Sequence, residues 1–236
     1  MKIIFLFLMN FLLSQVLTDI SFIGSKSLGM AGAVVSDSED LEAVFHNPAG
    51  LVKIKENITL ISGRSQLYGL DFLNFEYLSV GFSNGFALTY QHLGTSYKNS
   101  SDFSGDYSSY GFHEFNGLLS REKSISLSQG ISLLDDKNSK ISIGYNLNYM
   151  SLYQGASAGP TGNGENGLSS SDIASFGIDV GLLSSLRDKV SFGAFVKNIN
   201  NPKIIKGSSS SYLPRRLDLG ITYYPFNDLT TTFAME

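Results

Sequence analysis

The sequence predicts an all-β protein, a transmembrane antiparallel β-barrel with a short N-terminal helical hatch, or plug. Two observations predict it. From about Asn57 onward the dominant hydrophobic periodicity is two residues, which is the pattern of β-strands. Only 16% of the 236 residues are charged, whereas soluble domains typically carry about 25%. The apolar residues also stand singly instead of in the runs that a soluble core would require.

The first residues predict export. Met1 and Lys2 supply a short cationic start, and Ile3 to Leu13 form an apolar run interrupted only by Asn10. A transmembrane helix needs about 20 apolar residues, so this shorter run, followed by polar residues, is typical of a signal peptide. We therefore expect residues 1–18 to be a signal peptide, with an uncleaved interfacial anchor as the alternative.

Residues 19–56 are predicted to form the plug, an element too short to fold by itself. Ser36 and Glu39 have the spacing of a capping box, which predicts a short helix over 37–45 with Asp37 in solvent at its positive end.

The end of this helix is predicted from the segment Asn47-Pro48-Ala49-Gly50-Leu51. A residue that precedes proline is pushed out of the helical region, so Asn47 should end the helix. Gly50 should then permit the turn into the first strand.

Residues 57–236 are predicted to form the barrel wall. The clearest strand is Ile141 to Tyr153, in which odd positions are mostly apolar or aromatic and even positions are small or polar. Candidate strands lie near 57–63, 72–82, 85–95, 110–119, 123–134, 140–154, 171–186, 189–199, 213–225 and 229–235. Short polar turns at 83–85, 135–138 and 225–228 alternate with long polar segments at 98–109 and 155–172. Short turns at one rim and long loops at the other are typical of outer-membrane barrels.

A soluble β-sandwich would show the same alternation, so the composition of the second face decides between the two folds. A sandwich needs an outer face rich in Lys, Glu and Thr, but the second face here is mostly Ser, Gly and Asn, which suits a crowded barrel interior. Several candidate strands also exceed the usual five or six residues of soluble proteins. Both observations favour the barrel.

The order GSKSLGMAGA (Gly24 to Ala33), then VFHNPAGL (Val44 to Leu51), resembles the N-terminal signature of FadL-like outer-membrane barrels, particularly the PorV/PorQ branch. Segments near 177–199 and 213–220 resemble later strands of that branch. The resemblance implies a barrel of about fourteen strands with the N-terminal segment folded inside as the plug. It also implies that Asn47, Pro48, Ala49 and Gly50 form a plug or gating motif. Because the chain ends at Glu236 without a terminal aromatic residue, we expect it to be a fragment that lacks the last strands of such a barrel, or a naturally shortened one.

Other chemistry is disfavoured by context. The chain has no cysteine, a net charge of −4 and no Lys/Arg-rich run, which excludes thiolate sites and argues against nucleic acid as a partner. Gly81 to Gly85 fits the G-x-S-x-G pattern, but it joins two strands and not a strand to a helix. Gly162 to Gly167 fits G-x-G-x-x-G, but no helix follows it.

The titratable residues predict no metal site, cofactor or catalytic centre. His46, His92 and His113 lack the spacing of metal ligands. Asp135 and Asp136 are expected in a solvated turn.

Three functions remain open at this stage. The resemblance to the PorV/PorQ branch implies a non-enzymatic role in protein secretion of the type IX kind, with secretion-system proteins as partners. The wider FadL-like resemblance implies passage of long-chain fatty acids or other hydrophobic small molecules through the outer membrane. A secreted soluble β-sandwich adhesin is the third.

Overall fold

The computed structural model describes residues 23–67, 70, 73–96, 118–154, 171–203, 212–226 and 229–236. The predicted signal peptide, most of the two predicted long loops, the G-x-G-x-x-G segment and His113 lie outside these residues. Among the described residues, no helix is long and apolar enough to cross a bilayer.

The described strands form one antiparallel sheet, in which every strand pairs with its neighbours in the sequence. The order is β1 to β9 without a crossover. The strands are β1 (Ile58–Gln66), β2 (Leu73–Phe82), β3 (Phe86–Ser96), β4 (Leu118–Asp135), β5 (Ser139–Gln154), β6 (Ser171–Leu186), β7 (Val190–Lys197), β8 (Arg216–Phe226) and β9 (Leu229–Met235). The all-β, antiparallel prediction is therefore confirmed, and the two packed sheets of a sandwich are not what these strands form.

The predicted strands agree with the observed ones to within a few residues, with one exception. The predicted strands at 110–119 and 123–134 are not separate in the described part, because β4 runs unbroken from Leu118 to Asp135. The rest of the first candidate lies outside the described residues. The turn at 83–85 joins β2 to β3 and the turn at 136–138 joins β4 to β5, as predicted.

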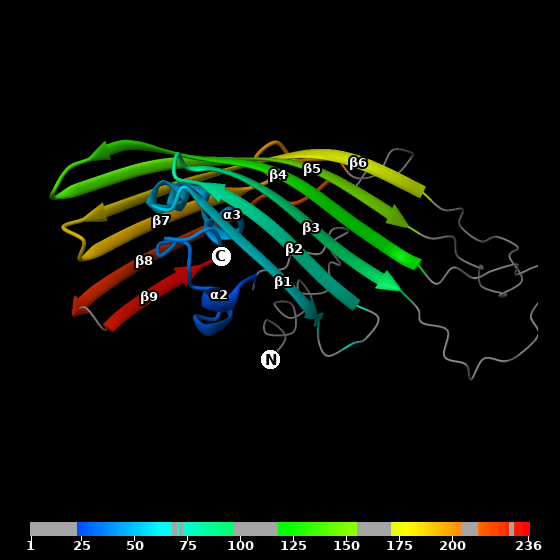
Figure 1. The fold of residues 1–236 in the computed structure, drawn as a ribbon, viewed down its shortest axis with the longest axis horizontal. Coiled ribbons are helices and arrows are strands. Elements are labelled where there is room, and N and C mark those ends of the chain that lie inside the picture. The colour runs from blue at the N-terminus through cyan, green and yellow to red at the C-terminus, as the bar shows by residue number, and fades with distance from the viewer. Residues whose placement is uncertain are drawn as a thin grey trace, which may run out of the picture.

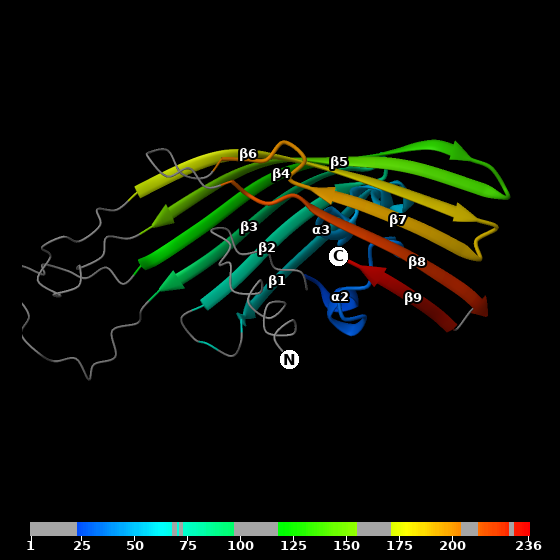
Figure 2. The same cartoon turned by 180° about the vertical axis from the view of Figure 1, so that it is seen from behind.

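The sheet is strongly curved, and its concave side holds the N-terminal segment (Figures 1 and 2). This segment contains α2 (Ser25–Gly29), α3 (Ala43–His46) and the 3₁₀ helix η2 (Pro48–Lys53). We call residues 23–56 the plug. Its apolar side chains pack with those of β2 and β3 in a core that includes Leu41, Phe45, Leu51 and Phe75.

The predicted helix over 37–45 is wrong, because only Ala43–His46 is helical. Ser36 makes no capping bond to the helix; its hydroxyl lies 2.8 Å from that of Thr222 on β8. Ser36 therefore bonds with the sheet instead of capping the helix that follows it. Asn47 does end the helix, in an extended conformation. Gly50 lies inside η2 and allows close approach of the chain, since a β-carbon there would collide with the backbone of Ser38.

The convex face of the sheet is apolar along continuous rows of side chains that run across neighbouring strands. One row consists of Leu60, Val80, Leu88, Leu127, Leu147 and Ile178. A second, which we call the aromatic row, lies one step nearer the β3–β4 connection and consists of Leu78, Tyr90, Ile125, Tyr149 and Phe176. All five side chains of the aromatic row are exposed, by 39 to 53%.

The apolar surface ends at the next row, which is polar. This polar row consists of Arg64, Glu76, His92, Lys123 and Ser151. Glu76 accepts from Arg64 at 3.2 Å, and the His92 ring lies 3.9 Å from the same carboxylate. The convex face therefore changes from aliphatic to aromatic to charged within two rows.

Candidate functional site: the plug and the adjoining cavity

Asn47 fastens the plug to the sheet from a fully buried position. Its Nδ2 donates to the carbonyl oxygens of Val35 at 2.8 Å and Leu182 on β6 at 3.0 Å. Its Oδ1 accepts from the backbone N–H of Ala49 at 3.2 Å, which caps η2. One side chain thus joins two parts of the plug to the wall and fixes the start of the 3₁₀ helix.

Glycines on the concave face let the plug backbone lie directly on the strands. Gly130, Gly144 and Gly181 stand opposite one another on β4, β5 and β6. A β-carbon at Gly144 would collide with the backbone of Pro48 and Ala49, and one at Gly181 with the Asn47 amide. Glycine at Gly144 allows close approach of two backbones, and at Gly181 it leaves room for the Asn47 side chain. We call these three residues the glycine row.

A second set of bonds joins the plug to β8. Tyr224 donates its hydroxyl to Oδ1 of Asp37 at 2.7 Å, and Oδ2 of Asp37 lies 3.1 Å from Nζ of Lys26. Asp37 is 6% exposed. The prediction that Asp37 lies in solvent at a helix start is therefore wrong, because the residue is part of the contact between plug and wall.

The strand β5 contributes polar side chains to the same interface. Ser142 donates to the carbonyl oxygen of Ala49 at 2.9 Å, and Nδ2 of Asn146 donates to that of Val44 at 3.0 Å. Both residues are buried on the concave face. The small polar face that the sequence predicted for this strand is confirmed, and its function is to bind the backbone of the plug.

Burial and neighbouring charges shift three titratable groups of the plug. Burial lowers the pKa of His46, against the opposing effect of its 2.8 Å hydrogen bond with the carbonyl oxygen of Ile23. Burial, assisted by Asp40, raises the pKa of Glu42. Burial would raise the pKa of Glu39 as well, but the hydrogen bond and charge of Lys53 outweigh it and the pKa is lowered.

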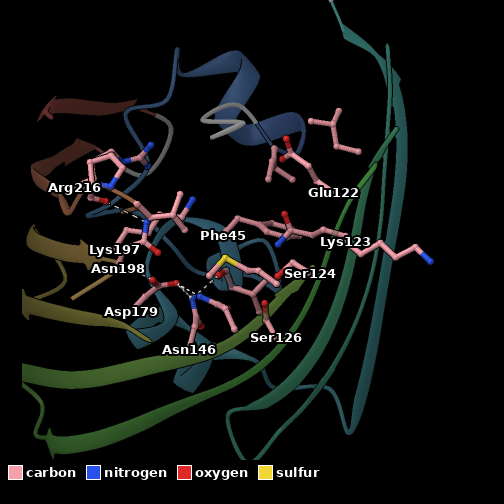
Figure 3. A pocket seen from close by; sticks show the side chains of 18 of the residues that line it. Phe45, Glu122, Lys123, Ser124, Ser126, Asn146, Asp179, Lys197, Asn198 and Arg216 are labelled. Carbon is pink, nitrogen blue, oxygen red and sulfur yellow. Dashed lines mark hydrogen bonds between the residues drawn. The ribbon is translucent and has the colours of Figure 1, made fainter. Parts of the chain in front are cut away.

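A cavity of about 280 Å³ lies between the plug and the concave face of the sheet (Figure 3). The plug contributes Ile23, Val44 and Phe45, and other apolar walls come from Phe75, Leu93 and Met150. Polar and charged side chains from β3 to β8 and from residues flanking the strands line most of the remainder, among them Lys197, Arg215, Arg216 and Glu236. The Lys123 side chain points away from the cavity (Figure 3), as its place in the polar row of the convex face requires.

The most buried charged group of the cavity is Asp179 on β6, which is 2% exposed. Its Oδ2 accepts from Nδ2 of Asn148 at 2.6 Å and of Asn146 at 3.2 Å. Its Oδ1 accepts from the backbone N–H of Asn198 at 2.9 Å. Asn198 adopts a positive φ of 56°, which asparagine tolerates better than most residues. The carboxylate thus joins β5, β6 and the end of β7.

The structure places all four predicted motif residues, Asn47, Pro48, Ala49 and Gly50, in the buried interface between plug and sheet. A gating role for them stays a prediction. His46 and His92 lie on different elements, and the described residues contain no cluster of three metal-ligating side chains. Ser83 of the G-x-S-x-G segment lies in the β2–β3 turn. Asp135 and Asp136 are exposed at the β4–β5 turn, as expected.

Sequence reasoning did not identify the Asp179, Asn146 and Asn148 cluster or the Tyr224 bond to Asp37. The available signal was the polar residue in an otherwise small or apolar stretch, Gly177-Ile178-Asp179-Val180-Gly181. A buried charge usually has bonding partners, but finding them requires the register of β5 against β6, which places Asn146 opposite Asp179.

Of the comparisons with family models, curated proteins and solved structures, only the comparison with solved structures gives matches. No protein-family model and no curated protein matches the sequence. Among solved structures, the Pseudomonas putida toluene transporter TodX matches with a TM-score of 0.41 and 14% sequence identity. The match covers 84% of this chain and 66% of the transporter, so the chain spans less than two thirds of that protein's length.

Proposed function

We propose that the protein is an exported outer-membrane β-barrel that passes small hydrophobic molecules across the membrane, with the plug controlling passage. The observation that carries the proposal is the distribution of side chains on the two faces of the sheet. The convex face exposes rows of aliphatic and aromatic residues, while the concave face buries Ser, Asn, Thr and Asp. A soluble protein would place these groups the other way round, whereas a membrane barrel requires this arrangement.

The boundary on the convex face supports the membrane assignment. Membrane barrels carry aromatic residues where the hydrocarbon meets the polar headgroups. The aromatic row, with Tyr90, Tyr149 and Phe176, lies directly beside the polar row. We take this pair of rows as one edge of the membrane. β4, β5 and β6 have 18, 16 and 16 residues, more than the 9 to 11 that a tilted spanning strand needs.

The interface between plug and wall is where a route would lie. The plug is tied to β5, β6 and β8 by hydrogen bonds, and the cavity opens beside it. A molecule that passes along the concave face must therefore move the plug or follow the cavity past Phe45. Most bonds on the wall side go to the plug backbone or to short side chains, and a displacement of the plug would have to break several of them.

Passage can be tested with a reversible disulfide between plug and wall, because the chain has no native cysteine that could form a competing bond. The Ser36 and Thr222 hydroxyls lie 2.8 Å apart, so the double variant S36C/T222C offers a disulfide between plug and wall. Full-length protein in lipid vesicles should take up labelled toluene or a fatty acid when reduced, and take up much less when oxidised.

The matched control for this disulfide is S83C/T232C, whose two positions lie in the β2–β3 turn and on β9 and cannot tie the plug to the wall. Oxidation should leave its uptake unchanged. Uptake no faster than that of empty vesicles in both redox states of both proteins would refute the transport proposal.

A platform role in protein secretion, as in the PorV/PorQ branch, is the second candidate. The specific observation in its favour is how firmly the plug is fixed, through buried Asn47, Asp37 and Ser36, which suits a closed barrel with a docking surface. Recovery of secretion components with the tagged barrel from native membranes would support this role, and their consistent absence would exclude it.

A further inference from the structure

The cavity beside the plug contains a buried negative charge that has only neutral partners. Asp179 accepts hydrogen bonds from two asparagine amides and one backbone N–H. Among the described residues, no cationic nitrogen lies within 4.0 Å of this carboxylate, since none of their ion pairs includes it. Arg216, which also lines the cavity, pairs with Asp218 at 3.0 Å.

A second acceptor lies next to the carboxylate. Nδ2 of Asn146 already donates to Val44 and Asp179, which fixes the orientation of the amide. Its Oδ1 is buried and has no hydrogen-bond partner among the described residues. A buried acceptor without a donor is costly, and native proteins rarely leave one unexplained. The carboxylate and this amide oxygen together form an acceptor pair.

The apolar side chains and the volume of the cavity indicate what the rest of a ligand would look like. Phe45 is 8% exposed and lines the same cavity as the acceptor pair, together with Met150 (Figure 3). An aromatic ring packs favourably against another ring or an aliphatic chain. The cavity of about 280 Å³ is roughly twice the size of one that holds benzene. A single ring with a short side chain therefore fits it.

We propose that this cavity binds a small primary ammonium compound with an aromatic or aliphatic body, its ammonium group on Asp179 and Asn146 and its apolar part against Phe45. The inference rests on the proposed function and narrows it, because a purely apolar molecule would leave the Asn146 amide oxygen without a donor and the Asp179 carboxylate without a counter-charge. Binding is coupled to the plug through Asn146, whose amide nitrogen holds both Asp179 and the carbonyl oxygen of Val44.

The test uses full-length protein in detergent micelles near neutral pH and four probes of similar size: 2-phenylethylamine, 2-phenylethanol, ethylbenzene and 3-phenylpropionate. Calorimetric titration should show the amine binding at least tenfold more tightly than ethylbenzene, with the carboxylate weakest. Asp179→Asn should reduce the affinity for the amine by about 10- to 100-fold and leave that for ethylbenzene within about twofold. Equal affinity for the amine and ethylbenzene in the wild type would overturn the proposal.

Two further variants keep the result interpretable. Asp188→Asn removes a carboxylate at the exposed β6–β7 turn, where it pairs with Lys140, and should change no affinity. Phe45→Leu keeps the acceptor pair and an apolar wall but removes the ring contact with the apolar part, and should weaken the amine and ethylbenzene by a similar factor of about two- to fivefold. If Asp179→Asn does not fold, the wild-type probe series together with Phe45→Leu still decides, and a Phe45→Leu variant that binds both probes as tightly as the wild type counts against the site.

The outcomes separate this inference from the proposed function. Uptake of ethylbenzene into vesicles with no preference for the amine in binding would leave transport standing and refute the ammonium site. Tight amine binding without uptake of any probe would refute transport and leave the site. Binding and uptake of none of the four would refute both.

Discussion

The Asn47 side chain lies directly against Gly181, where its amide reaches the carbonyl oxygen of Leu182 on the next residue of β6 at 3.0 Å. A β-carbon at Gly181 would collide with Oδ1 of Asn47, so the glycine leaves room for the amide that makes this bond. A residue of the plug and a residue of the wall are thus fitted to each other across 134 positions of sequence. The stability of the plug depends on several contacts of this kind.

Replacing Asn47 by leucine should destabilise the folded protein strongly. The substitution removes the bonds donated to the carbonyl oxygens of Val35 and Leu182 and the bond accepted from the backbone N–H of Ala49, all at the buried interface. Each unpaired buried group costs about 1–3 kcal/mol. Urea unfolding in lipid vesicles should show a loss of at least about 2 kcal/mol, whereas Asn138→Ala in the exposed β4–β5 turn should be neutral. A loss below that of the control would show that the Asn47 bonds carry no net stability.

The glycine row should not tolerate a methyl group. Gly144→Ala places a β-carbon on the backbone of Pro48 and Ala49, so the plug must shift, at a cost of about 1–3 kcal/mol. The matched control is Gly29→Ala, where a β-carbon meets nothing within 4 Å. Limited proteolysis should cut the plug faster in Gly144→Ala only. Equal rates in the two variants would contradict the close contact.

Two adjacent tyrosines on β8 provide a paired test of the Asp37 contact. Tyr224 faces the plug and donates to Asp37, while Tyr223 is 50% exposed on the convex face. Tyr224→Phe should lower the free energy of unfolding by about 1–2 kcal/mol, since the bond goes to a charged acceptor in a partly buried place. Tyr223→Phe should change it by less than about 0.5 kcal/mol. Similar effects from the two variants would argue against the bond.

The pKa of His46 predicts a pH dependence of stability. Burial lowers this pKa in the folded protein below the ordinary 6.5, so the unfolded chain takes up a proton first as the pH falls. The contribution of His46 is therefore complete above pH 6.5 and is lost progressively below it. His46→Gln should show a shallower loss between about pH 6.5 and 5, measured as the urea midpoint across the pH series. Parallel curves for the two proteins would mean that His46 does not contribute.

Much of the wall could be predicted from the sequence, because a period of two residues determines both the strand and its two faces. The strand predicted at 140–154 is β5, observed at Ser139–Gln154. The register between neighbouring strands could not be predicted in the same way. The alternation does not say that Gly144 lies opposite Gly181, or Asn146 opposite Asp179, and the cavity follows from those pairings.

The plug was the least predictable part, because its contacts with the wall override its local sequence preferences. The spacing of Ser36 and Glu39 favours a capping box, yet Ser36 bonds with Thr222 and Glu39 with Lys53. No pattern within the plug identifies a partner on β8. The end of the helix at Asn47 was predictable, since the effect of Pro48 on the preceding residue is purely local.

The bonds from Ser36 and Asp37 to β8 also have a consequence for the order of folding. Their partners lie 186 and 187 residues further along the chain. The plug cannot make these contacts until β8 is in place, and contacts between such distant residues form slowly. Until then its apolar side chains, including Leu41 and Phe45, have no finished core to enter. Although the plug precedes all nine described strands in the sequence, it is thus expected to settle after them and to take its shape on the surface that they form.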